Sequence, residues 1–219
     1  MVIEDDRDRE VFTAGGRADY AISPDTSIFV SAAANWRDYR LDPPAPGVFV
    51  KRDSNGYEAL VGANFDLSHL LRGEAAVGYL SQSFDDPSLD SQSGLAVRGS
   101  IEYFPDPLVT ITLNASREIA DAGVIGASSY VSNSVGAVLD YEFRRNVIAG
   151  VGVAYDRDEY DGVDRDDDRF DAFAKVDFAM NRAAALFLQY DFQNQDSAGA
   201  SAGRDYEVNR VTFGLRLRR

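Results

Sequence analysis

The stretch Val109-Thr110-Ile111-Thr112-Leu113-Asn114-Ala115-Ser116 decides the fold, because apolar and polar residues alternate along it without a break. Successive side chains of a β-strand point to opposite faces, so this alternation predicts a strand with one apolar and one polar face. The same period recurs along nearly the whole chain. In the preceding segment Leu95 and Val97 lie on one face, whereas Arg98 and Glu102 lie on the other. The sequence therefore predicts an all-β protein.

Eleven strands are expected, each about 11 to 14 residues long. Strands of soluble domains usually have ~5–6 residues, whereas tilted strands that cross a membrane need ~9–11, so strand length favours a transmembrane barrel. The expected strands are 9–22, 27–40, 55–67, 73–84, 94–104, 108–118, 130–143, 147–160, 169–179, 183–193 and 206–217.

The connections alternate between short turns and long polar loops. This arrangement is typical of antiparallel up-and-down barrels of the bacterial outer membrane, which have short turns at one end and longer loops at the other. The short turns are expected at Ser23–Thr26, Pro105–Pro107, Arg144–Asn146 and Asn181–Arg182. The long loops are expected at Leu41–Ser54, Asp85–Ser93, Ile119–Ser129, Asp161–Asp168 and Asn194–Asp205.

Composition excludes several classes of function. The 219 residues carry a net charge of −14, which repels phosphate backbones and argues against a nucleic-acid partner. There is no Cys, so a disulfide framework and a thiolate metal site are both excluded. The longest uncharged run, 122–139, is interrupted by Gly, Ser and Asn residues and does not read as a membrane helix.

Aromatic residues gather near the ends of the expected apolar faces, while Ala, Val, Leu and Gly fill the middles. Tyr and Trp prefer the headgroup level of a membrane, so two aromatic girdles are expected. The alternative is that these residues form the core of a soluble β-sandwich. The aromatic residues are Trp36, Tyr57, Phe65, Tyr103, Tyr141, Phe143, Tyr155, Phe170, Phe178, Tyr190 and Phe192.

Five segments resemble the β-barrel porin type 2 family of Gram-negative outer membranes: 52–58, 66–74 with 77–79 following, 160–169, 203–206 and 209–217. The resemblance covers nearly the whole chain, which is similar to the C-terminal part of longer family members. It implies a porin-like barrel without a catalytic motif, and some relatives imply a link to polysaccharide export. It also implies contact with outer-membrane lipids, lipopolysaccharide and the barrel assembly machinery.

We expect residues 1–219 to form a single outer-membrane β-barrel domain, with 1–8 as the remnant of an external loop. Bacterial single-chain barrels have an even number of strands. Eleven strands therefore predict that at least one strand precedes Met1. No secretory signal opens the chain, so either the start is truncated or the protein is not exported.

Twelve charged residues fall on the expected polar faces. A charge that faces lipid at the midplane costs ~2–4 kcal/mol for Arg or Lys, so these side chains are expected to point inward. They are either a channel lining that selects solutes or a network of paired charges that braces a closed interior. Both require a barrel of more than ~8 strands. The twelve are Arg17, Asp19, Glu58, Arg98, Glu102, Asp140, Glu142, Lys175, Asp177, Asp191, Arg210 and Arg216.

The densest run of carboxylates, 156–168, is expected to be a solvated external loop. Carboxylate oxygens also bind divalent cations, so a weak cation site is the alternative, with Asp161, Asp164, Asp166 and Asp168 as candidate ligands. No other cofactor is expected. His69, the one histidine, falls in an expected turn rather than on a strand face beside a serine, which argues against a Ser-His-Asp hydrolase.

Two functions remain open. The first is an outer-membrane channel or conduit for polar solutes. The second is a structural or adhesive barrel that has a closed interior and binds partners through its acidic loops. Neither is an enzyme.

Overall fold

The computed structural model describes residues 8–40, 51–67, 70–122, 124 and 126–217. Within these ranges no helix is long and apolar enough to cross a membrane. The described residues form eleven strands, so the predicted all-β class and the number of strands are confirmed. The strands are β1 (Arg9–Ser23), β2 (Thr26–Tyr39), β3 (Ser54–Leu67), β4 (Leu71–Phe84), β5 (Gln92–Asp106), β6 (Val109–Asp121), β7 (Ser129–Arg144), β8 (Val147–Tyr160), β9 (Asp166–Ala179), β10 (Ala184–Ala198) and β11 (Tyr206–Leu217).

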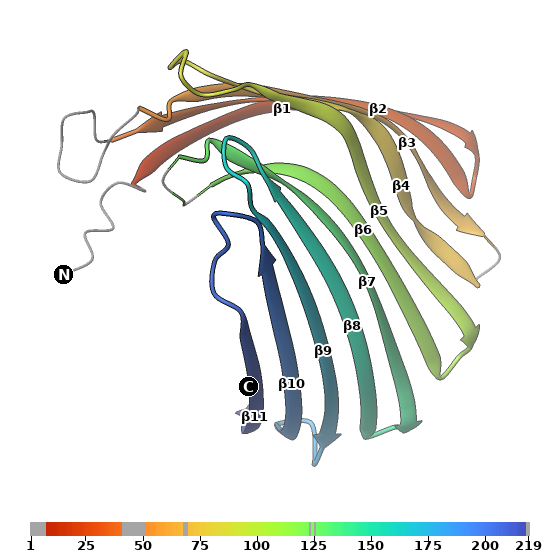
Figure 1. The fold of residues 1–219 in the computed structure, drawn as a ribbon. Helices are drawn as coiled ribbons and strands as arrows, with labels where there is room; N and C mark the ends of the chain where they lie inside the picture. The colour runs from red at the N-terminus through yellow and green to blue at the C-terminus, as the bar shows by residue number, and fades with distance from the viewer. Residues whose placement is uncertain (1–7, 41–50, 68–69, 123, 125, 218–219) are drawn as a thin grey trace.

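All eleven strands belong to one antiparallel up-and-down sheet in which each strand pairs with its neighbours in the chain. The sheet curls into a trough, with β1 along one free edge and β11 along the other (Figure 1). Because the number of strands is odd, β1 and β11 run in the same direction. Each edge leaves a row of backbone N–H and C=O groups without a ladder partner among the described residues.

Short turns and longer loops sort to opposite ends of the sheet, as predicted. The turn end carries residues 24–25, 107–108, 145–146 and 180–183, and the loop end carries residues 85–91, 122, 124, 126–128, 161–165 and 199–205. The loop expected at 41–54 falls largely outside the described residues. His69 lies outside them as well.

All four of these loops are shorter than the sequence predicts, and those after β8 and β10 are shorter because β9 and β10 continue through polar residues. Asp166 pairs with Ala198 and Asp168 pairs with Asp196, so the ladder satisfies these backbone groups whatever the side chains are. Gly162 and Gly199 make the remaining turns with φ of 83° and 104°, a left-handed conformation that favours glycine.

Register gives the sheet two chemically different faces. One cross-strand row runs Ala18, Val30, Val61, Val77 and Val97 through five strands. We call the face that carries this row the outer face, and the opposite face the inner face. All eleven aromatic residues expected in girdles lie on the outer face.

The buried apolar cluster lies on the inner face of β2–β5, around the middle of β3 and β4. Its members are Phe29, Leu60, Ala76, Leu80 and Ala96, each no more than 6% exposed. On the outer face, in contrast, large apolar side chains are exposed, for example Val61 at 54% and Leu113 at 46%. Side chains crowd together on the concave side of a curled sheet and spread apart on the convex side. The inner face is therefore the concave one.

Candidate functional site

All twelve charged residues predicted to point inward lie on the inner face. Register fixes this, since Arg17 pairs with Ser31, Glu58 with Leu80 and Lys175 with Gly150, all of which are inner-face positions. The same ladder carries the inner face through β5, β6 and β7 to the last strands. Alternation alone therefore predicted a common face for side chains up to ten strands apart.

Contacts that skip a strand confirm that this face is concave. The guanidinium of Arg17 on β1 is 2.8 Å from Glu74 on β4, across β2 and β3. Arg98 on β5 is 3.2 Å from Glu58 on β3. Such pairs form only where the sheet brings the ends of long side chains toward one another. The inner face is thus a charged trough.

Ten of the twelve charges have a polar partner on this face, and most partners are opposite charges. Arg17 also binds Asp19, while Asp191 accepts a hydrogen bond from Gln189 at 2.5 Å. Glu142 and Arg210 have no ion pair within the part of the chain that the structure describes. The remaining pairs are Lys175–Asp140 (3.0 Å), Arg216–Asp177 (3.6 Å) and Glu102–Arg72.

Three of the inner-face cations are held by aromatic rings as well as by carboxylates. Each ring packs against a glycine of the neighbouring strand. A Cβ added to that glycine would come within 2.3–2.5 Å of the ring, so only a residue without a side chain leaves room for it. The cation then sits over the ring, as in other cation–π pairs. These units hold the charged ends in place. They are Gly62–Phe29–Arg17, Gly152–Phe173–Lys175 and Gly214–Phe187–Arg216.

Sequence reasoning missed several inner-face charges. Arg72 lay just outside the expected strand, and Glu74 at the start of that strand was not selected. Asp156, Asp158 and Arg169 were assigned to an external loop or left out, yet they lie within β8 and β9. Arg169 is 3.6 Å from both carboxylates, and the side chain of Asp158 is buried. All five residues occupy the inner-face positions of their strands, so the alternation of faces along each strand could have identified them.

The four candidate cation ligands are not gathered into one site. Asp161 accepts from the Ser128 hydroxyl, and Asp164 accepts from the Ala200 backbone N–H. No group of three or more potential metal ligands occurs within the described ranges. The other two bind elsewhere, Asp166 to Arg157 and Asp168 to the Tyr155 hydroxyl. A divalent-cation site at this loop stays a prediction.

The β4–β5 loop adds a fixed negative charge at the loop end. Both the hydroxyl and the backbone N–H of Ser88 donate to Asp86 Oδ1, at 2.6 and 2.8 Å. The hydroxyl bond and then the backbone bond hold the pKa of Asp86 below its usual range. Asp86 therefore stays charged to a lower pH than an ordinary aspartate does.

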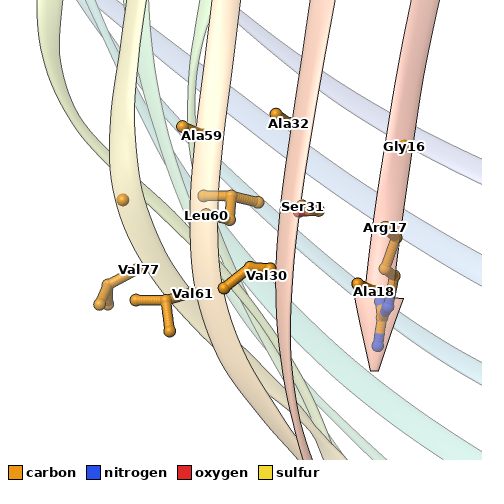
Figure 2. Close-up of a pocket in the computed structure, with 11 residues that line it drawn as sticks. Gly16, Arg17, Ala18, Val30, Ser31, Ala32, Ala59, Leu60, Val61 and Val77 are labelled. Carbon is orange, nitrogen blue, oxygen red and sulfur yellow. The ribbon is translucent and has the colours of Figure 1, made fainter. Parts of the chain in front are cut away.

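An apolar hollow lies on the outer face over β1–β4. Small residues form its floor, since Gly16, Ala32 and Ala59 are consecutive in one cross-strand row. Figure 2 shows Val30, Val61 and Val77 aligned in the adjacent row. The lining is almost entirely carbon, so the hollow offers no group for chemistry or polar binding. The polar inner face is the candidate functional surface.

Comparison with solved structures shows the same fold. The crystal structure of the outer membrane channel DcaP of Acinetobacter baumannii matches with a TM-score of 0.63 at 13% identity, covering 93% of this chain and 61% of that one. The chain thus spans less than two thirds of that protein, and identity this low shows the fold alone. The CymD monoaromatic hydrocarbon channel gives a TM-score of 0.44 at 11% identity, covering 95% of this chain and 73% of that one. No curated protein matches the sequence.

Comparison with protein families gives a match over the full length. Residues 1–219 match the family described as "Putative beta-barrel porin 2". That family is the one the five sequence segments resemble, and its name agrees with the up-and-down sheet and its two faces. The chain belongs to this β-barrel porin family.

Proposed function

We propose that this chain forms the wall of a porin-like channel for polar solutes in the outer membrane of a Gram-negative bacterium. Membership of the porin family points to a bacterial outer-membrane location. The observation that carries the proposal is the division of one curled sheet into an apolar convex face and a charged concave face. That division suits a wall with lipid outside and water inside.

The energetics support this orientation. An Arg or Lys in contact with lipid at the midplane of a barrel costs ~2–4 kcal/mol, and the inner face carries several such residues. On the concave side the same charges meet water, opposite charges and one another. Pores select solutes through charges placed in this way.

The lining is mixed, with a modest acidic excess. Seven of the twelve predicted lining residues are carboxylates and five are cations. Because most are paired, the lining is expected to attract polar solutes of either sign and to favour cations weakly. A role in polysaccharide export is the finer proposal, and it rests on the family resemblance together with a polar wall that suits long hydroxylated chains.

Conductance tests the proposal. The full-length protein, refolded in detergent and checked by heat-modifiable gel mobility, is expected to give discrete conductance steps in planar bilayers. A correctly refolded protein that never conducts would overturn the channel.

The ion pairs favour a second candidate, a closed barrel that binds partners through its acidic loop end. This candidate predicts no conductance. It also predicts that D161N and D164N, which remove carboxylates without deleting strand residues, weaken adhesion of whole cells to their surface partner.

Arg210 gives a specific prediction for charge selectivity. It lies opposite Asp191 in the β10–β11 ladder but forms no ion pair among the described residues, so its charge is only partly offset. R210Q is therefore expected to raise the permeability ratio of K⁺ to Cl⁻ by roughly twofold, read from the reversal potential in a salt gradient.

The control for this prediction is R157Q, which removes the same charge from the outer face. Arg157 pairs there with Glu159 and Asp166. R157Q should leave the reversal potential unchanged. Equal shifts in the two variants would contradict the assignment of Arg210 to the lumen.

A further inference from the structure

Apart from Gly126, the described residues of the connection between β6 and β7 are buried or half-buried, unlike most loops at a protein surface. We call its described residues, 119–122, 124 and 126–129, the β6–β7 tip. Ala122 and Ala127 are each 1% exposed, and Ser129 is fully buried. A connection with so little exposure must be covered by other parts of the chain.

The sheet is split where this tip begins. The β5–β6 ladder stops at the pair Val97 and Arg117, and residues 92–96 pair with β4 but not with β6 within the described chain. Beyond Arg117 the tip is free to leave the edge of β5. Ile119 packs against the inner-face cluster that includes Phe29 and Ala96. The tip therefore lies against the concave side of β2–β5.

A buried carboxylate fixes the tip to the first two strands. The side chain of Asp121 is only 5% exposed and binds Arg37 on β2. It also lies 2.5 Å from Arg9 on β1 and accepts a hydrogen bond from the Tyr39 hydroxyl at 3.1 Å. Charge-assisted bonds at a shielded site are the stronger kind of polar contact.

Arg52, which precedes β3, holds the same segment through its backbone. Its guanidinium donates to the carbonyl oxygens of Ala122 at 2.6 Å and of Val124 at 3.0 Å. On the far side, the Ser128 hydroxyl donates to Asp161 in the β8–β9 loop at 3.2 Å. The tip is thus bound to β1, β2 and the segment before β3 on one side, and to the neighbouring β8–β9 loop on the other.

The span of these contacts shows that they cross the trough. Four strand steps separate β2 from β6, which is roughly 19 Å along the sheet at ~4.8 Å a step. Direct contact between Arg37 and Asp121 is possible only by the shorter path over the concave side. At the loop end, Figure 1 shows the adjoining ends of β6 and β7 lying within the curl of β1–β5.

We infer that the β6–β7 tip is the constriction of the channel, and that the contacts of Asp121 hold it across the loop-end mouth. The tip then limits the size of the solutes that pass, so Asp121, Arg37 and Arg52 are positioning residues for permeation. This inference rests on the proposed channel function. Its test needs one measurement that depends on conduction and one that does not.

The test compares D121N with the unaltered protein in both measurements. Amide hydrogen exchange of a peptide covering residues 117–130 is expected to become about tenfold faster, because the shielded charge-assisted bonds are lost. Single-channel conductance is expected to rise about twofold. D90N is the matched control, since it removes an exposed carboxylate from the β4–β5 loop, and it should change neither quantity.

The outcomes separate the two proposals. If amide exchange is unchanged in D121N, the contacts of Asp121 do not hold the β6–β7 tip in place. If exchange is faster but single-channel conductance is unchanged, the tip is not the constriction. If neither D121N nor the unaltered protein conducts, the proposed channel function is wrong, and the constriction is wrong with it. Should D121N lose heat-modifiable mobility, R52Q supports the same comparison, because it removes only bonds to two backbone carbonyls.

Discussion

The substitution Leu113→Arg is expected to block stable assembly, whereas Thr112→Arg at the next position is expected to be tolerated. Leu113 is an outer-face residue opposite Ile101 and Ala137, in a row between the two aromatic zones. A charge placed there meets lipid and costs ~2–4 kcal/mol, a large part of the stability of a typical domain. Thr112 faces inward opposite Glu102, which can pair with the new cation.

Two measurements distinguish these variants. The first is the fraction of protein with heat-modifiable mobility after refolding into lipid vesicles. The second is the urea midpoint followed by the fluorescence of Trp36, which is the single tryptophan and is exposed on the outer face. Leu113→Arg should lower both readouts and Thr112→Arg neither. Equal losses would contradict the assignment of the outer face to lipid.

The strands and their faces could be predicted from the sequence because a single physical rule governs both. A period of two residues sets the face of each side chain, and the short turns keep neighbouring strands in register. Thr112 and Leu113 illustrate this, since their opposite faces follow from one alternating stretch. Asp166–Asp168 illustrate the limit of the rule: alternation is lost there, yet the ladder continues because it needs only the backbone.

Contacts that depend on curvature could not be predicted in this way. The pair Arg17–Glu74 skips two strands, and only the curl of the sheet brings its ends together. The contact of Asp121 with Arg37 depends in addition on the split between β5 and β6. Nothing in a one-dimensional pattern records where a ladder stops. The twelve lining candidates were thus predictable as a face, whereas their partners and the β6–β7 tip were not.

Tight contact between strands leads to the last expected result, a large loss of stability in Gly78→Ala. A Cβ at Gly78 would lie 1.9 Å from the carbonyl oxygen of Ala59 and 2.8 Å from Leu60 Cα, which are backbone atoms of the paired strand. Backbone cannot move aside as a flexible side chain does, so the β3–β4 ladder itself must shift.

Overpacking of this kind costs about 3 kcal/mol, at the upper end of the usual range because main-chain bonds are disturbed as well. Gly94→Ala is the matched control, since nothing lies within 4 Å of its added Cβ. Alanine is favoured over glycine within strands by ~0.5–1 kcal/mol, so that variant should be neutral or slightly more stable. The urea midpoint in vesicles, again followed by Trp36, should fall for Gly78→Ala alone. A midpoint equal to that of Gly94→Ala would mean that β3 and β4 are not held this closely. The close curl of the sheet over β1–β5 would then be contradicted, and the constriction depends on that curl.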